Sequence, residues 1–210
     1  MNRLLVAAAA VLINFTSLRA QDARAGAILD AMSQKYKAMN SFVAAFTYNT
    51  EGAGGETYKG DVTVKGAKFR LKLAGQEVFN DGKQVATFVK ETNEVNISDY
   101  DPSESELSPA KIYTIYKKGY TYKFTSEEKE GGQTYELVEL TPQNKQTQVA
   151  KIQISVNKKD RSVKSWKITN RNGQKQTFRI DKFTPSNNTP DSFFVFDKSK
   201  YPGVEVVDLR

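Results

Sequence analysis

The fold of this chain is decided by residues 42–97, FVAAFTYNTEGAGGETYKGDVTVKGAKFRLKLAGQEVFNDGKQVATFVKETNEVNI. Apolar side chains alternate with polar ones through most of this stretch, and a period of two predicts β-strands with one apolar face. Asp81-Gly82 supplies the positive φ that a tight hairpin turn requires, so Val78-Phe79 should fold back onto Val85 to Val89. The stretch therefore predicts an antiparallel sheet whose apolar face needs a cover.

Further strands continue this pattern to the C-terminal part of the chain. Asn172-Gly173 marks a second hairpin turn, and we expect about eleven strands in all. A closed barrel of eight strands is just filled by its own side chains, so eleven strands curled part of the way round enclose a wider space. The predicted fold class is mainly β with helices (α+β), as an unclosed antiparallel β-barrel with a helical lid.

Two helices are predicted, and both are candidates for the lid. The first begins at an N-cap, Asp22, and its apolar positions recur at helical spacing until residue 40. The second is short: Ser108 is a capping residue, Pro109 occupies the first helical position and Gly119 ends it. A helix of that length is marginal in water, so it must be stabilised by packing on the sheet.

The N-terminal segment, residues 1–20, is typical of a secretory signal peptide. It has a short positive start, an apolar run to Phe15 and a small residue, Ala20, at the expected cleavage site. The alternative is an uncleaved anchor, but the apolar run is short for a membrane helix. We therefore expect export and a single domain over residues 21–210, and the absence of cysteine favours the periplasm.

Composition argues against most kinds of catalysis. The chain contains no histidine and no cysteine, which removes the commonest general base, the thiol nucleophile and most zinc sites. Paired carboxylates such as Asp81 with Glu77, or Asp99 with Asp101, stay possible, but they lie in turns and loops where solvation is the ordinary explanation. We predict that the protein is not an enzyme and uses no metal or cofactor.

Other ligand classes are also disfavoured. The net charge is +7, and loss of Arg3 and Arg19 with the signal leaves 29 basic and 24 acidic residues, or +5. The lysines alternate with apolar residues along strands, as solvent-facing positions do, so nucleic-acid binding is not indicated. The glycines of residues 51–55 precede a strand and not a helix, and the acids of residues 99–106 lack the ligand order of a calcium loop.

The aromatic content favours an apolar binding site. Twelve phenylalanines, ten tyrosines and one tryptophan provide wide apolar walls with a few hydroxyl groups. Burial of an acyl chain is worth about 0.8 kcal/mol per methylene, so one C16 chain gains on the order of 10 kcal/mol before ordering costs. A half-closed aromatic sheet is therefore suited to shield a lipid tail.

Several short motifs occur in one order along almost the whole chain beyond residue 20. They are Met39-Asn40-Ser41-Phe42-Val43-Ala44-Ala45-Phe46-Thr47, Gly60-Asp61-Val62-Thr63-Val64-Lys65, Asn80-Asp81-Gly82-Lys83, Asn93-Glu94-Val95, Leu107-Ser108-Pro109, Phe193-Phe194-Val195-Phe196 and Pro202-Gly203-Val204-Glu205-Val206. In this order the chain resembles the periplasmic outer-membrane lipoprotein carrier protein (LolA) family, in a version like those of Bacteroidetes. The resemblance implies a monomer that receives acylated lipoproteins from an inner-membrane ABC lipoprotein-releasing transporter and delivers them to an outer-membrane acceptor.

The resemblance and the alternation together give a predicted site. The acyl-chain-binding wall would be Phe46, Tyr48, Val62, Val64, Phe69, Leu71, Val78, Phe88, Val95 and Ile97. The lid would be Met32, Tyr36, Ile112, Ile115 and Tyr116, covering the wall when no ligand is bound.

One departure from the family concerns the lid. Better known members carry an arginine and a proline after the strand that corresponds to Val64-Lys65, and the arginine bonds the lid shut. This chain has Gly66-Ala67-Lys68 there, so Lys65, Lys68 or Arg70 would be the lid lock, or apolar contacts alone would hold the lid. Two other functions stay open: a lipid- or glycolipid-binding or lipid-sensing domain of the same fold, and a structural interaction module whose apolar face is core.

Overall fold

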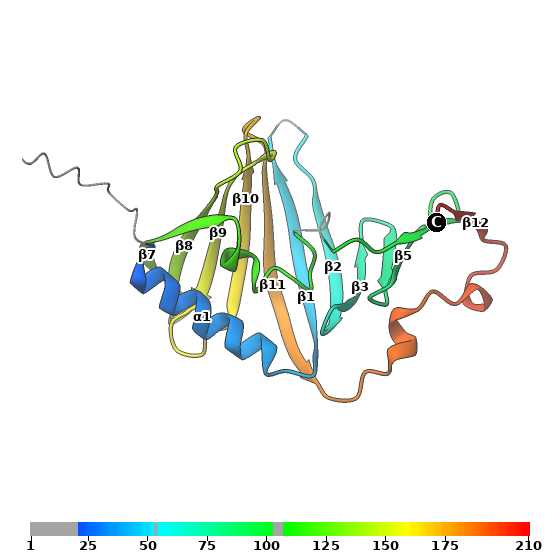
Figure 1. Cartoon of the computed structure of the whole chain (residues 1–210), viewed down its shortest axis with the longest axis horizontal. Coiled ribbons are helices and arrows are strands. Elements are labelled where there is room, and N and C mark those ends of the chain that lie inside the picture. Colours follow the sequence, from blue (N-terminus) through cyan, green and yellow to red (C-terminus); the bar gives the residue numbers. More distant parts are fainter. Residues whose placement is uncertain (1–20, 53, 103–106) are drawn as a thin grey trace, which may run out of the picture.

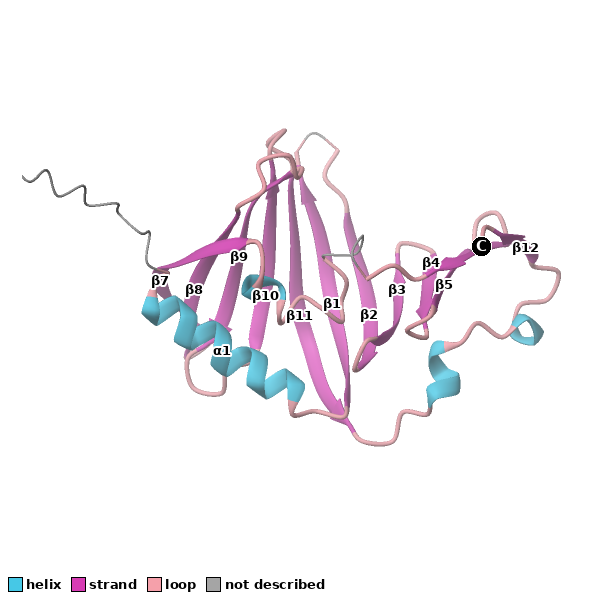
Figure 2. Ribbon diagram, in the orientation of Figure 1, coloured by secondary structure: helices cyan, strands magenta, loops and turns pink. Residues whose placement is uncertain are grey.

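The computed structural model describes residues 21–52, 54–102 and 107–210; the predicted signal peptide and part of the acidic loop lie outside them. In these residues twelve strands form one sheet in the order β12-β6-β5-β4-β3-β2-β1-β11-β10-β9-β8-β7 (Figures 1 and 2). The two end strands, β12 and β7, do not pair, so the sheet stays open. The predicted fold class is confirmed, with one strand more than expected.

The elements have the following bounds. They are α1 (Ala23–Lys37), β1 (Ser41–Glu51), β2 (Thr57–Lys65), β3 (Lys68–Leu73), β4 (Gln76–Asn80), β5 (Gln84–Val89), β6 (Glu94–Asp99), η1 (Ile115–Lys117), β7 (Tyr120–Glu130), β8 (Gln133–Pro142), β9 (Val149–Asn157), β10 (Val163–Asn170), β11 (Lys175–Ser186), η2 (Asp191–Phe194), η3 (Lys198–Lys200) and β12 (Glu205–Asp208).

The sheet consists of two meanders joined at its middle. Strands β1 to β6 follow one another outward from β1, and β7 to β11 return from the other end of the sheet until β11 pairs with β1. The chain must therefore cross from one end of the sheet to the other between β6 and β7, as the green connection in Figure 1 shows. We call residues 107–119, the described part of this connection that precedes β7, the crossing segment.

One face of the sheet is covered by α1 and the crossing segment, and we call it the helix face. Directly paired residues in antiparallel strands share a face. Val62 pairs with Leu71 and Leu71 with Val78, and all three belong to or pack against a large apolar cluster. Ile28 and Leu29 of α1 are buried in the same cluster, so the helix lies on this face.

The other face carries the C-terminal arm, residues 190–204. Arg70 pairs with Phe79, and Phe79 pairs with Ala86. Since Phe79 is next to Val78 in the strand, these three side chains point to the face opposite to that of Val78. Phe79 and Ala86 form a separate small cluster with Val204 of the arm. We call this side of the sheet the arm face; the sequence did not indicate that both faces of strands β4 to β6 are covered.

The second predicted helix is not a helix for most of its length. Residues 107–114 form turns, and a 3₁₀ helix is present only at η1. The backbone carbonyl of Ser108 accepts bonds from the N–H groups of Lys111 and Ile112, but the Ser108 hydroxyl is buried and makes no hydrogen bond within the described residues. Ser108 is therefore not the side-chain cap that we predicted. Gly119 ends the segment with a φ of 80°, as a left-handed terminator does.

Candidate functional site

Most of the predicted wall residues lie together on the helix face. Each of these is either buried in the large cluster or packed against it: Phe46, Tyr48, Val62, Val64, Phe69, Leu71 and Val78. They come from four consecutive strands, β1 to β4, and form the wall beneath the crossing segment. Strand β11 adds Phe178 and Phe183, which the sequence analysis did not assign to the site.

Three predicted wall residues lie on the arm face instead. Phe88 pairs with Val95, and Ile97 pairs with Ala86, so these side chains belong with Phe79 and not with Val78. The prediction placed these three side chains on the same face as Val78 of β4, whereas they point to the opposite face. Because Phe79 and Val78 are both apolar, alternation alone did not show which of the two faces the helix.

The five predicted lid residues are buried in the same cluster as the wall. They are Met32 and Tyr36 of α1, and Ile112, Ile115 and Tyr116 of the crossing segment. Tyr113, which was not among the predicted lid residues, joins the two parts of the cover. Its ring stacks on Tyr36 with centroids 3.8 Å apart and meets Trp166 edge-on at 5.9 Å. Burial raises the pKa of Tyr36 to about 12, so its hydroxyl stays protonated.

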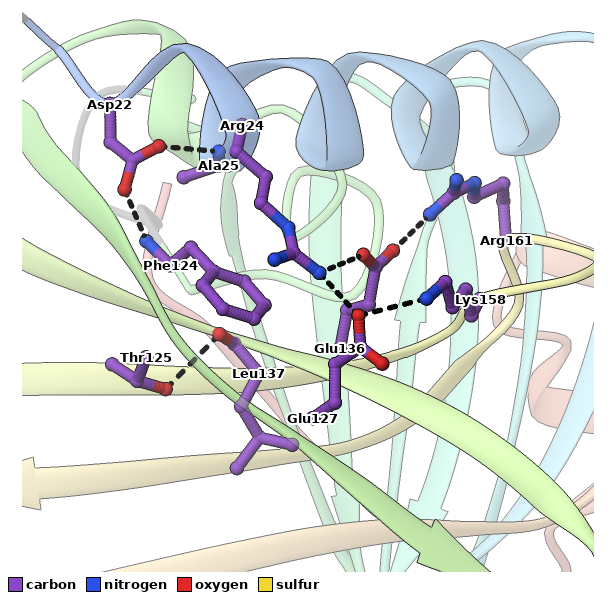
Figure 3. A network of polar contacts seen from close by, with 10 residues as sticks. All are labelled: Asp22, Arg24, Ala25, Phe124, Thr125, Glu127, Glu136, Leu137, Lys158 and Arg161. Atoms are coloured by element: carbon purple, nitrogen blue, oxygen red, sulfur yellow. Dashed lines mark hydrogen bonds and ion pairs between the residues drawn. The ribbon is translucent and has the colours of Figure 1, made fainter.

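Helix α1 is clamped to the sheet at its N-terminus (Figure 3). The Asp22 carboxylate accepts hydrogen bonds from the N–H of Ala25, 3.0 Å away, and from the N–H of Phe124 in β7, 2.9 Å away. These bonds lower the pKa of the Asp22 carboxyl. Arg24 lies over the Phe124 ring at 3.6 Å and donates to Glu136, a buried carboxylate of β8, at 2.9 Å. The first turn of the helix is thus joined to two strands.

The clamp extends to the turn between β9 and β10. Arg161 donates to Glu136, and Lys158 lies 2.9 Å from Glu127, which also pairs with Arg24. Hydrogen bonds from Lys158 and Arg24 lower the pKa of the Glu127 carboxyl. One cluster of opposite charges therefore connects α1, β7, β8 and the turn between β9 and β10.

The C-terminal half of α1 is also fixed to strands. Lys35 donates to the backbone carbonyl of Asp160 at 2.7 Å, and the Tyr36 hydroxyl accepts a hydrogen bond from the N–H of Val163, the first residue of β10, at 3.0 Å. Since α1 is bonded to the sheet at both ends, we treat it as the fixed part of the cover.

The crossing segment has fewer polar contacts. The Tyr116 hydroxyl donates to Asp30 of α1 at 2.6 Å, and Lys117 lies 3.9 Å from the same carboxylate. Burial, together with the negative charge and hydrogen bond of Asp30, raises the pKa of Tyr116. Lys111 donates to the carbonyl of Pro102, within the same connection. Apart from the bond to Asp30, the described segment is held mainly by its apolar side chains.

The three predicted lock residues do not contact the crossing segment. Lys65 and Lys68 each lie 2.8 Å from the carboxylate of Asp191, the first residue of η2 in the arm. Arg70 pairs with Glu77, and its guanidinium lies 4.7 Å from the ring of Phe193. They lock the arm onto the arm face, so the prediction of a lid lock is wrong for all three.

The two lysines change the acidity of their partner in the arm. Hydrogen bonds from Lys65 and Lys68 lower the pKa of Asp191 to about 2. The carboxylate therefore stays charged at every pH well above 2.

A hollow of about 270 Å³ opens between α1, the sheet and the crossing segment. Its lining includes Tyr36, Met39, Phe42, Val64, Ala110 and Tyr113. This hollow lies against the wall and the cover at once, and Lys37, Asn40 and Thr114 add polar groups to its lining.

The described residues offer little for catalysis or for a metal. No group of three or more acidic side chains in residues 21–52, 54–102 and 107–210 is arranged to hold a metal ion. Among the same residues no helix is both long and apolar enough to cross a bilayer. The arrangement in the described residues is an apolar wall beneath a cover made of α1 and the crossing segment.

Comparisons with known proteins agree with this arrangement. The model of the family "Outer membrane lipoprotein carrier protein LolA" matches residues 37–197. An uncharacterized conserved protein from Thermus thermophilus has a TM-score of 0.59 at 13% identity, over 88% of this chain and 99% of that one. At that identity the likeness shows a shared fold. No curated protein matches the chain.

Two further solved structures are more distant. A LolA superfamily protein from Nitrosomonas europaea has a TM-score of 0.46 at 14% identity, over 83% of this chain and 98% of that one. The Mycobacterium tuberculosis lipoprotein LppX has a TM-score of 0.46 at 12% identity, over 79% of this chain and 99% of that one.

Proposed function

Since the chain belongs to the outer membrane lipoprotein carrier protein family, LolA, we propose that it carries the acyl chains of lipoproteins on its helix face. In this proposal the protein is exported to the periplasm and works as a monomer. It takes lipoproteins released by an inner-membrane ABC transporter and passes them to an acceptor in the outer membrane. The role involves binding and transfer, with no catalytic step.

The observation that carries the proposal is the apolar cover over the wall. The crossing segment buries Ile112, Tyr113, Ile115 and Tyr116 in the same cluster as the wall residues. A segment of turns and one 3₁₀ helix has few internal backbone bonds to hold its shape. Its side chains occupy the site as a ligand would, and acyl chains would take their place.

The two parts of the cover would behave differently during loading. Helix α1 is bonded to β7, β8 and β10 through Asp22, Arg24 and Tyr36, so its displacement would break a charged network. The crossing segment is joined to α1 by one side-chain hydrogen bond, from Tyr116 to Asp30, and by the stacking of Tyr113 on Tyr36. We therefore assign the opening motion to the crossing segment and a fixed role to α1.

The energies of closure and loading are similar. Burial of an apolar side chain contributes about 1.5–3 kcal/mol, so four such side chains of the crossing segment stabilise the closed state by about 6–12 kcal/mol. One C16 acyl chain gains about 10 kcal/mol on leaving water. Because the two quantities nearly balance, a ligand can replace the segment and can later be released to a membrane acceptor.

The test is retention of a lipoprotein by variants of the wall and the cover. The exported protein is expressed together with a lipoprotein in a bacterial host, purified from the periplasm and measured by native mass spectrometry. Val62→Glu and Ile115→Asp should abolish co-purification because each places a charge in the apolar site. Leu71→Glu, at a partly exposed wall position, tests the same face if Val62→Glu does not fold.

The matched control is Val43→Glu. Val43 lies in β1 on the arm face and is 36% exposed, so the same charge there should leave retention unchanged. An acylated protein bound to the wild type and lost from the wall variants supports the proposal. A free lipid would indicate a lipid-binding domain of the same fold, and neither ligand would indicate that the helix face is structural core. Equal retention by Val62→Glu, Leu71→Glu and Ile115→Asp would also contradict the proposal.

A further inference from the structure

Strand β3 pairs with only the second half of β2. Their pairing begins at Lys65 with Lys68 and stops at Asp61 with Lys72, whereas Thr57–Gly60 continue to pair with β1. On their other side Thr57–Gly60 pair with no strand of the described residues. We call this gap between β2 and the β3–β4 hairpin the fork.

Gly60 marks the point where the strands part. A Cβ atom at this residue would lie 2.6 Å from the backbone oxygen of Lys72 and 2.8 Å from the ring of Phe46. The backbone of β3 therefore approaches β2 closely at Gly60, and the two strands diverge immediately beyond it. The fork is set by this close contact between packed strands.

The free edge of β2 presents backbone hydrogen-bonding groups to the fork. The N–H of Thr50 donates to the carbonyl of Glu56, so Glu56 directs its backbone groups toward β1. Backbone groups alternate in direction along a strand, so Tyr58 and Gly60 also face β1. Thr57 and Lys59 then direct their N–H and C=O groups outward into the fork. An edge of this kind is a template for another extended chain.

The surroundings of the fork are basic on one side. A hollow of about 620 Å³ lies here, and its lining includes Lys59, Lys72 and Lys90, all exposed. Lys59 and Lys72 lie on the arm face together with Asp61. Lys90 is two residues after Phe88, which lies on the arm face, so its side chain points to the same face. Asp61 and Glu77 also line the hollow; Glu77 pairs with Arg70 and, at 3.5 Å, with Lys72, so the remaining lysines of the lining are Lys59 and Lys90 against one carboxylate, Asp61. The positive charge therefore exceeds the negative charge beside the free edge.

We propose that the fork binds an extended acidic segment of a partner protein, which adds to β2 beside Thr57–Gly60 as a further strand. The backbone of the segment would bond to Thr57 and Lys59. Side chains at alternate positions of an added strand point to one face, so acidic residues at every second position would meet Lys59, Lys72 and Lys90. The three lysines lie on the arm face, opposite to the apolar wall, and this proposal does not depend on acyl-chain binding.

The probe is a fluorescein-labelled peptide of five Glu-Thr repeats, measured by fluorescence anisotropy with the full mature chain. Binding should be weakened by salt, because exposed charge pairs are screened. A Lys-Thr peptide of the same length should not bind. A Glu-Thr peptide with methylated backbone nitrogens at alternate positions keeps its charge but cannot pair as a strand, and it should bind at least tenfold more weakly.

Three variants locate the site. Lys59→Glu combined with Lys90→Glu should weaken binding by up to about twenty-five-fold, since each exposed charge pair contributes up to about fivefold. Lys59→Pro removes an outward N–H without altering the bonds to β1 and should also abolish strand addition. If Lys59→Pro does not fold, Thr57→Pro tests the same edge at the first residue of β2.

The matched control is Lys83→Glu, at the opposite end of the β4–β5 hairpin from Lys90. It changes the net charge in the same direction and should leave binding almost unchanged. The proposal is overturned if the Glu-Thr peptide does not bind, if its methylated form binds equally well, or if Lys83→Glu weakens binding as much as Lys59→Glu combined with Lys90→Glu. A dimer in solution that is abolished by Lys59→Pro would overturn it too, because a second copy would then occupy the edge.

Discussion

The bond between Tyr116 and Asp30 offers a direct way to test which part of the cover moves. The Tyr116 hydroxyl donates to Asp30 at 2.6 Å and is the closest side-chain hydrogen bond from the crossing segment to α1 among the described residues. Tyr116→Phe removes this bond and keeps the apolar ring. If the segment must leave the site before an acyl chain enters, the substitution should make uptake easier.

The size of the effect follows from the bond and its exposure. A hydrogen bond to a charged group contributes about 1.5–3 kcal/mol and an ordinary one about 0.5–1.5 kcal/mol. The Asp30 side chain is 59% exposed, so water competes for it and a value of about 1 kcal/mol is appropriate. Loss of about 1 kcal/mol from the closed state raises the apparent affinity for a ligand about fivefold. The same loss lowers the melting temperature by about 2–4 °C in a chain of this size.

The assay uses the tryptophan that the chain already contains. Trp166 lies on the helix face and its ring contacts Tyr113 of the crossing segment, so its emission should change when the segment lifts. Titration with a dansyl-labelled C16 fatty acid, followed by energy transfer from Trp166, gives the apparent affinity. Tyr116→Phe should bind the probe about fivefold more tightly than the wild type although it melts at a lower temperature.

Tyr36→Phe is the matched control for this experiment. It also removes one tyrosine hydroxyl from the cover, but that hydroxyl bonds the N–H of Val163 and so holds α1 to the sheet. The variant should lose stability, since it leaves a buried N–H unpaired at a cost of about 1–3 kcal/mol, without a gain in affinity. Tighter binding by Tyr36→Phe together with unchanged binding by Tyr116→Phe would refute the assignment and make α1 the moving part.

Two further predictions concern the arm and the sheet. The pKa of Asp191 is lowered to about 2, so its contribution to arm docking should be complete above its ordinary pKa near 3.8 and be lost as the pH falls through 2. Asp191→Asn should show faster amide exchange around η2 (Asp191–Phe194) at pH 7, and equal protection in both proteins would argue against the latch. Gly60→Ala should lower the free energy of unfolding in urea by about 1–3 kcal/mol because the added methyl group meets the Lys72 carbonyl. Gly26→Ala, where a Cβ would lie an ordinary 3.5 Å from Tyr122, should instead raise it by about 0.5–1 kcal/mol; a change of the same sign in both glycine variants would contradict the close contact at Gly60.

The sequence was sufficient for the parts of the fold that depend on local pattern. The hairpins at Asp81-Gly82 and Asn172-Gly173 form as predicted, with φ values of 90° and 85° at the two glycines. The first helix begins after Asp22, whose side chain accepts the predicted capping bond from Ala25. These features are set by a few adjacent residues, so a single sequence contains the information needed.

The face of each strand was harder to predict where both faces are covered. From β1 to β3 one face is apolar and the other polar, and alternation placed Val62, Phe69 and Leu71 on the same face, as the structure does. In β4 and β5 both phases contain apolar residues, because the arm covers one of them. The arm returns from more than a hundred residues further along the chain, and local pattern does not show where it packs.

The lock residues could have been assigned better from the sequence itself. Lys65 follows Val64, and Lys68 precedes Phe69 in strands that pair directly. The alternation that placed Val64 and Phe69 beneath the lid therefore placed both lysines on the opposite face, where no lid lock can be made. The resemblance to family members with an arginine lock pointed to residues 65–70, which do form ion pairs, but it assigned them to the lid, whereas Lys65 and Lys68 pair with Asp191 of the arm.

The two covers of this sheet are held by different forces, and this difference bears on their roles. The arm is held by the ion pairs of Asp191 with two lysines and by the contact of Phe193 with Arg70, in addition to the apolar cluster around Phe79 and Val204, so charge contributes to its docking. The crossing segment is held mainly by buried apolar side chains, with one bond from Tyr116. An apolar ligand can replace apolar contacts at little net cost in free energy, but it cannot replace an ion pair. A lipid tail should therefore displace the crossing segment and leave the arm in place, so that loading changes one face of the sheet and preserves the other.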